Sequence, residues 1–158
     1  MVEKYEQIEG ILHSFREVNR AVACLIREEA DELDATVVQI MVLWILKKHP
    51  NIGLGELADH LQVTNSTMSG VVDRLVEAGL IVRERSDLDR RTVTMRLTPE
   101  GDKKQNEAFG ENSLLTKRLF RILEVADEDL MHLLHTHTQL LEKLKGKGDE
   151  IKDGERAV

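Results

Sequence analysis

The sequence predicts a mainly α-helical fold with a small antiparallel β-sheet, and three observations support this class. Apolar residues recur at helical spacing along most of the 158 residues. Residues 92–97 instead alternate polar and apolar side chains, which is the period of a half-buried strand. Capping residues precede several of the apolar stripes and mark where helices begin. Together these patterns place the strands near the middle of the chain, with helices on both sides.

Two helices are expected before residue 50. The first carries a long apolar stripe, which consists of Ile8, Ile11, Leu12, Phe15, Val18, Val22, Leu25 and Ile26. It covers about five turns, which suggests a surface shared between subunits, although a plain core helix fits the same pattern. The second helix begins at the capping box Thr36-Val37-Val38-Gln39, and His49-Pro50-Asn51 ends it. Residues 52–54 are expected to add a short strand to the sheet.

A pair of shorter helices follows, separated by a turn at Gln62 and Val63. The first of them, residues 56–61, has one apolar face. Thr64 is a good N-cap for the second, because its hydroxyl can accept from free backbone N–H groups. The buried stripe of this second helix is expected to consist of Met68, Val71, Val72, Leu75 and Ala78. Gly79 is placed to end the helix in the left-handed conformation.

The opposite face of this second helix provides candidate DNA contacts. It is formed by Thr64, Asn65, Ser66, Thr67, Ser69, Gly70 and Arg74. Short, neutral polar side chains suit a helix whose N-terminal end enters the major groove, and Gly70 removes bulk there. Arg74 lies to the side, where it could reach the DNA backbone. Capping preferences alone produce similar clusters, so this face does not by itself distinguish a DNA reader from an ordinary helix start.

The next segment favours the DNA-binding interpretation. Residues 80–85 and 92–97 are expected to form two strands, joined by a polar loop with arginines at its tip. Such a ribbon suits the minor groove, because narrow A·T tracts attract arginine; an ordinary hairpin with a solvated tip is the alternative. The residues assigned to the tip are Arg85, Asp89, Arg90 and Arg91, with Asp87 and Asp89 expected to brace the arginines. The stretch from Leu54 to Gly101 therefore predicts a winged helix-turn-helix.

Several of these residues resemble the signature of a known family. The matching positions are Leu57-Ala58, Val63-Thr64, Val72-Asp73-Arg74-Leu75, Gly79-Leu80-Ile81, Asp89-Arg90-Arg91 and Leu97-Thr98-Pro99-Glu100-Gly101. In this combination they resemble the multiple-antibiotic-resistance regulators, the MarR family, and the flanking helices extend the resemblance over essentially the whole chain. The resemblance implies a homodimeric DNA-binding transcriptional regulator, expected to be a repressor, that a small ligand often releases.

The resemblance also implies roles for individual residues. Arg91 would be the minor-groove arginine with Arg90 beside it, and Arg74 would contact phosphate. The major-groove contacts would come from Asn65, Ser66, Thr67 and Ser69. An effector pocket would lie where the first, second and fifth helices meet, lined by His13, Arg16 and Trp44. A cation and a flat apolar wall suit an aromatic anion, although an ordinary core position is the alternative for Trp44.

Charge and composition limit the possible functions. The formal net charge of −7 argues against nucleic acid at first sight. However, five arginines accompany only three acidic residues between Ile81 and Arg96, so basic charge is concentrated in the wing. One cysteine allows no internal disulfide and fits a reducing cytoplasm, the expected location. The sequence has no apolar run long enough to span a membrane, and no catalytic motif, so neither an enzyme nor a cofactor is expected.

The C-terminal third is predicted to be helical. One connector helix is expected to run from Gly101 to about Glu124, and a last helix to begin at Asp127. The expected divisions are an N-terminal dimerisation helix (1–33), a DNA-binding lobe (34–101), connector and C-terminal dimerisation helices (102–145), and a polar tail expected to be disordered (146–158). Two paired copies would place their recognition helices about 34–36 Å apart, which predicts a pseudo-palindromic operator.

Two further sites each have a functional interpretation and a purely structural one. His132 and His135 can share a helix face as metal ligands do, but we favour interface or solvated histidines, His137 included. Cys24 fits a buried structural thiol better than a peroxide sensor.

The sequence leaves two alternatives to an effector-released repressor. One is a metal-responsive regulator of the same fold. The other is a winged-helix protein-interaction module that does not bind DNA, which the acidic balance motivates.

Overall fold

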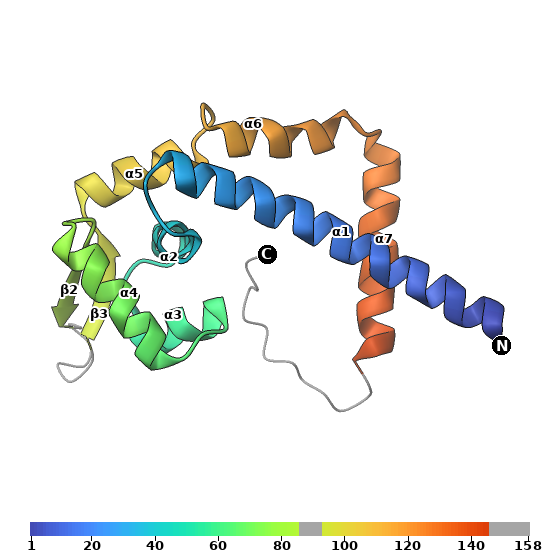
Figure 1. Cartoon of the computed structure of the whole chain (residues 1–158), viewed down its shortest axis with the longest axis horizontal. Coiled ribbons are helices and arrows are strands. Elements are labelled where there is room, and N and C mark those ends of the chain that lie inside the picture. The colour runs from blue at the N-terminus through green and yellow to red at the C-terminus, as the bar shows by residue number, and fades with distance from the viewer. Residues whose placement is uncertain (86–92, 146–158) are drawn as a thin grey trace.

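The computed structural model describes residues 1–85 and 93–145. Figure 1 shows a lobe built around a small sheet, with long helices extending from it as arms. The elements in chain order are α1 (Val2–Glu32), α2 (Val37–Lys48), β1 (Ile52–Gly53), α3 (Leu54–Leu61), α4 (Asn65–Glu77), β2 (Ile81–Arg85), β3 (Val93–Leu97), α5 (Pro99–Phe109), α6 (Leu114–Phe120), the 3-10 helix η1 (Arg121–Glu124) and α7 (Asp127–Leu144). The predicted fold class, mainly α-helical with a small antiparallel sheet, is confirmed.

The lobe is held together by one continuous apolar core. Its sheet has the strand order β1-β3-β2, and both pairings are antiparallel, with Met95 opposite Ile52 on one side and Arg83 on the other. The predicted short third strand is therefore present. The core residues come from α2, α3, α4 and the sheet, and they are Val42, Leu43, Ile45, Leu46, Leu57, Ala58, Met68, Val72, Leu75, Ile81 and Met95. This core fixes α4 on the sheet with its opposite face outward.

Local capping explains where the helices of the lobe begin and end. Thr36 and Gln39 form the predicted capping box at the start of α2. Thr64 caps α4, since its hydroxyl accepts from the backbone N–H of Thr67 at 3.2 Å. After α4, Gly79 adopts the left-handed conformation with φ +70°, as predicted. Each of these features depends on residues close together in the sequence, which is why the sequence pattern could predict them.

We call α1 and the segment from α6 to α7 (residues 114–144) the arms, and they bury far fewer side chains than the lobe does. In α1, the buried residues are confined to the C-terminal part, Ile26, Glu29 and Ala30. No residue of α7 is buried, and α7 crosses α1 far from the lobe (Figure 1). The two helices meet where the rings of Phe15 and His137 contact edge to face, with their centroids 5.3 Å apart. No helix within residues 1–85 and 93–145 has the length and apolar character required to cross a bilayer.

The prediction of one connector helix up to Glu124 is wrong. The structure ends α5 at Phe109, begins α6 at Leu114 and continues as a 3-10 turn from Arg121. Gly110 follows α5 in an extended conformation, and Ser113 caps α6 by accepting from the N–H of Thr116 at 3.0 Å. The buried carboxylate of Glu29 also accepts from the N–H of Leu115 at 2.9 Å. These groups satisfy backbone N–H groups at a new helix start, so the chain bends and α6 lies along α1 (Figure 1).

Candidate nucleic-acid interface

The residues predicted to read the major groove lie together on the outer face of α4. Thr64, Asn65, Ser66, Thr67, Gly70 and Arg74 are exposed, and Ser69 is half-buried. The helix faces the lobe core with Met68, Val72 and Leu75, all at most 1% exposed. Because the packing of these three residues determines how α4 is rotated, the polar face can only point into solvent. The polar residues singled out in the sequence therefore form one surface that is exposed except at the half-buried Ser69.

The hydroxyls at the start of α4 do not all have the same freedom. Thr64 Oγ1 lies 2.9 Å from Thr67 Oγ1 and also accepts from the Thr67 backbone, so both threonines take part in the cap. Asn65 and Ser66 make no side-chain hydrogen bond to other residues in the described parts of the chain. Their donors and acceptors are thus directed outward from the positive end of the helix dipole, where a phosphate or a base edge would be stabilised.

Gly70 leaves open space in the middle of this face. A Cβ atom built on it meets no atom within 4 Å. The lobe itself therefore does not require glycine at this position, since α4 is regular there and no neighbour approaches. A close approach by another molecule, such as the wall of a DNA groove, is a reason for keeping a residue without a side chain.

The wing is joined to α4 by an ion pair that the sequence analysis missed. Arg83 on β2 donates to Asp73 on α4 at 2.6 Å, and both side chains are partly exposed. A groove of about 350 Å³ lies beside this pair, between α4 and the sheet. It is lined by Leu54, Ser69, Asp73, Arg83, Val93 and Met95. The ion pair connects the two elements that a winged helix-turn-helix presents to neighbouring grooves.

A second ion pair lies within the wing. Arg96 on β3 donates two hydrogen bonds to the carboxylate of Glu84 on β2, at 2.8 and 2.5 Å. The bonds from Arg96 lower the pKa of Glu84 below its ordinary value of 4.5, and the same contact raises the pKa of Arg96. Of the three arginines in this segment that the structure describes, Arg83 and Arg96 are therefore paired with acids. Counting charges along the sequence missed this, because the strand register decides which side chains meet.

Arg74 and Arg85 are the described arginines of the interface that have no ion-pair partner in residues 1–85 or 93–145. Arg85 is exposed at the end of β2, beside the tip of the wing. The predicted tip residues Asp87, Asp89, Arg90 and Arg91 lie outside the described residues. The basic charge that the described structure offers to DNA is thus concentrated at one position on α4 and one on the wing.

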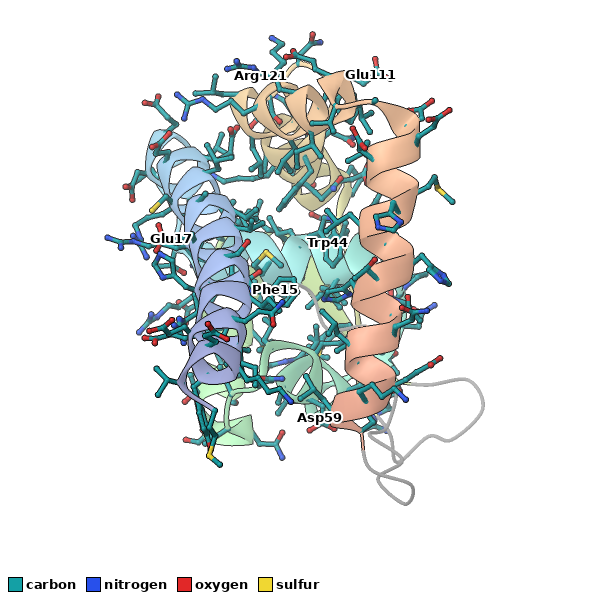
Figure 2. The ribbon with its side chains drawn as sticks, turned by 90° about the vertical axis from the view of Figure 1, so that its right-hand side faces the viewer. Phe15, Glu17, Trp44, Asp59, Glu111 and Arg121 are labelled. Carbon is teal, nitrogen blue, oxygen red and sulfur yellow. The ribbon has the colours of Figure 1, made fainter. Side chains whose placement is uncertain are left out.

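The residues expected to line an effector pocket are not brought together by the described contacts. His13 and Arg16 are exposed on α1, whereas Trp44 on α2 is half-buried. Trp44 packs against Phe109 of α5 with ring centroids 6.3 Å apart, and Lys48 Nζ lies 3.9 Å from its ring centroid. Figure 2 shows Phe15 on the side of α1 that faces α7, whereas Trp44 comes from α2, which lies in the lobe and away from α7 (Figure 1). Sequence reasoning missed Lys48, although Trp44 and Lys48 are one helical turn apart.

The two remaining candidate sites are the histidines of α7 and Cys24 of α1. His135 is hydrogen-bonded to Gln139 at 3.1 Å, and His132 is exposed on the same helix. Within the described ranges, no three His, Cys, Asp or Glu side chains gather closely enough to hold a metal ion. Cys24 is half-buried on α1 and forms no disulfide there.

This arrangement defines a class of protein. A core-anchored second helix, an exposed polar face at its start, and a two-stranded ribbon beside it form a winged helix-turn-helix. Residues 35–93, which cover the lobe up to the last strand, match the MarR family. The chain is also 30% identical over 113 residues to the HTH-type transcriptional repressor MdtR of Bacillus subtilis, covering 72% of each chain.

Solved structures support the assignment. NadR in complex with 4-hydroxyphenylacetate is 27% identical, with a TM-score of 0.68, covering 85% of this chain and 91% of that one. A point mutant of MepR from S. aureus, bound to an oligodeoxyribonucleotide, has the same fold at 24% identity, with a TM-score of 0.56 and coverage of 85% and 97%. The chain belongs to the MarR family of winged helix-turn-helix transcriptional regulators.

Proposed function

We propose that this MarR-family regulator acts in the cytoplasm as a homodimer that binds a pseudo-palindromic operator and represses transcription until a small molecule releases it. The observation that carries the proposal is the outer face of α4. Its exposed side chains are short, polar and uncharged near the helix start, with Arg74 one turn beyond Gly70. That is the chemistry a helix needs in order to contact base edges and phosphates in a major groove.

Each part of the interface has a role in this proposal. Asn65, Ser66, Thr67 and Ser69 contact the major groove, and Gly70 allows close approach. Arg74 contacts a phosphate, while Arg85 and the tip arginines Arg90 and Arg91 approach the minor groove. The structure of the MepR mutant with an oligodeoxyribonucleotide supports the use of this fold on DNA. In this proposal, residues 34–101 form the reading lobe.

The exposed apolar surface of the arms supports a dimer. Large apolar side chains lie exposed on α1 and on the segment from α6 to α7, far more than a monomer usually leaves in contact with water. They include Tyr5, Ile8, Leu12, Val18, Phe120, Leu123, Met131, Leu133, Leu134 and Leu144. A second copy that packs against them would remove this surface from water, so we propose residues 1–33 as a dimerisation helix and residues 102–145 as the connector and C-terminal dimerisation helices.

The proposed effector is an aromatic anion. NadR was solved with 4-hydroxyphenylacetate, and Trp44 with Lys48 provides a flat apolar ring beside a cation in this chain. A ligand wedged between the lobe and the arms would change the separation of the two recognition helices, so both could no longer occupy grooves one DNA turn apart. His13 and Arg16 remain proposed lining residues, although no described contact brings them to Trp44.

A gel-shift titration tests the DNA-binding part. The probes are a duplex carrying the region upstream of the protein's own gene and a duplex of scrambled sequence, at two salt concentrations. We expect Arg74→Ala to weaken binding and to reduce the salt slope by about one unit, because one phosphate contact is lost. Arg20→Ala, at an exposed position of α1, is the matched control. Equal and negligible affinity of the wild-type protein for both duplexes would instead favour the protein-interaction module.

Trp44 is the chain's one tryptophan, so its fluorescence tests the effector part. We expect 4-hydroxyphenylacetate to change the Trp44 emission and to weaken operator binding over the same concentration range. Lys48→Met keeps the stem of the side chain and removes its charge, so it should weaken both responses together. A change in operator binding without any change in emission would place the ligand elsewhere.

A further inference from the structure

We propose that Thr98 is a positioning residue that fixes the C-terminal end of the recognition helix α4 to the first turn of α5. The inference rests on the proposed role of α4 as the DNA reader. It concerns a joint on the side of the lobe where α4, the base of the wing and the connector meet. None of the residues predicted from the sequence to contact DNA belongs to this joint.

The hydroxyl of Thr98 is shared between the two helices. It donates to the carbonyl oxygen of Gly79 at 2.6 Å and accepts from the N–H of Gly101 at 3.0 Å. The first bond reaches Gly79, which follows the C-cap residue Ala78 of α4, whereas the second caps α5. The backbone N–H of Thr98 also donates to the carbonyl of Leu80 at 3.0 Å. Thr98 therefore connects the chain after the C-terminal end of α4 to the N-terminal end of α5 through three hydrogen bonds.

The backbones at this joint are too close to slide past one another. A Cβ atom on Gly101 would lie 1.8 Å from the carbonyl oxygen of Leu80, a distance that no side chain tolerates. Gly79 is held at φ +70°, and the N–H of Leu80 is bonded to Leu75 of α4 at 2.9 Å. Leu80 is thus bonded through its N–H to α4 and is packed through its carbonyl oxygen against Gly101 of α5. These two contacts fix the end of α4 relative to α5. A rotation of α5 is expected to carry α4 with it.

Such a joint matters more for reading bases than for holding phosphates. Contacts to base edges are short-range and fail when the helix tilts slightly, whereas attraction to phosphates acts over a longer range and tolerates misplacement. Loosening the joint should therefore weaken specific binding and leave non-specific binding almost unchanged. A residue that served only to cap α5 would not produce that difference.

The two roles of Thr98 can be separated by substitution. Thr98→Ser keeps both hydrogen bonds. Thr98→Asp keeps an acceptor for the N–H of Gly101, and aspartate is a good N-cap, but an ionised carboxylate cannot donate to Gly79. Thr36 is an exposed N-cap of α2 whose hydroxyl accepts from Gln39. Thr36→Asp is therefore the matched control, with the same change of side chain at a cap in the same lobe.

The measurements are gel-shift affinities for an operator duplex and for a scrambled duplex, together with amide hydrogen exchange. For Thr98→Asp we expect about a tenfold loss of operator affinity, the size of one mismatched base pair, with scrambled-duplex affinity unchanged. The Leu80 amide should exchange faster while the Gly101 amide stays protected. Thr98→Ser and Thr36→Asp should bind like the wild type.

The outcomes distinguish this inference from the proposed function. If the wild-type protein does not discriminate between the duplexes, the DNA-reading role itself fails. If the wild type discriminates and Thr98→Asp does so equally well, the role in positioning α4 is overturned. Equal losses on both duplexes, accompanied by faster exchange throughout α5, would show a structural cap only and would also overturn it.

Discussion

The lobe and the arms solve the problem of burying apolar surface in opposite ways. In the lobe, Leu43, Leu57, Met68 and Leu75 are all at most 1% exposed. In the arms, Leu133 and Leu134 of α7 are 57% and 61% exposed although they follow the same helical spacing. The helical pattern in the sequence is similar, so periodicity alone does not say whether a stripe packs within the chain. The difference teaches that the lobe buries its apolar stripes within one chain, whereas the arms leave theirs exposed, and this is the surface that the proposed dimer would cover.

The largest expected effect is in the lobe core. Leu75→Ala removes a buried side chain from the centre of α4 and leaves a cavity, so we expect the free energy of unfolding to fall by about 2–5 kcal/mol. The loss should be independent of protein concentration, because the contacts lie within one chain. Chemical denaturation at several protein concentrations measures this. A loss below about 1 kcal/mol would show that the lobe is less closely packed than the structure implies.

The next largest effect is on assembly. Leu134→Lys places a charge on the exposed apolar side of α7, so we expect the dimer to dissociate at micromolar concentration while the circular dichroism of the chain is retained. Sedimentation velocity measures the oligomeric state. Gln139→Lys, an exposed position of the same helix, is the control for the added charge. A Leu134→Lys protein that still sediments as a dimer would place the interface on another surface.

The ion pair between the wing and α4 should affect DNA binding more than stability. Arg83→Ala leaves the carboxylate of Asp73 unpaired near the proposed DNA surface, and like charges brought together across an interface are costly. We expect operator affinity to fall about tenfold, while the unfolding free energy changes by less than about 1 kcal/mol, as is usual for exposed pairs. Exchanging the charges with Asp73→Arg and Arg83→Asp together should restore part of the affinity. No recovery in the double variant would argue against a pairwise effect.

The smallest effect concerns pH and the wing. Because the folded-state pKa of Glu84 is lowered by Arg96, the pair stabilises the wing fully at pH values above the ordinary pKa of 4.5, which applies to the unfolded state. That stabilisation is lost as the pH falls through the folded-state value. We expect Glu84→Gln to lower Tm slightly at about pH 7, and the difference from the wild type to disappear once the pH is below the folded-state pKa, where the carboxylate is protonated in both states. Glu9→Gln on α1 is the control, and a difference that persists in acid would have another origin.

Features determined by neighbouring residues could be predicted from the sequence. The caps at Thr36 and Thr64 and the left-handed Gly79 depend on contacts within one or two turns, and all three were found. Of the predicted stripe of α4, Met68, Val72 and Leu75 are buried, whereas Val71 is half-buried and Ala78, after the last turn, is exposed. The polar face of α4 followed from that stripe, because one side of a helix determines the other.

Features determined by distant contacts could not be predicted in the same way. The ion pair of Arg83 with Asp73 depends on how the sheet lies on α4, and the bond from Thr98 to Gly79 spans 19 positions. The break at Gly110 was missed because the change from polar residues at 102–107 to apolar residues from 114 onward was interpreted as a change of surroundings along one helix. There the decisive signal was local, Gly110 followed by a capping Ser113, but the change of polarity was given more weight.

The space around Gly70 has a consequence for anyone who engineers this chain. Glycine inside a helix costs about 0.5–1 kcal/mol relative to alanine, and nothing in the described part of the lobe stands in the way of a methyl group at this position. A library screened for heat resistance should therefore enrich alanine at residue 70, whereas the same library selected for promoter occupancy should discard it. The two enrichment profiles, compared position by position, would map where function rather than folding has chosen the amino acid.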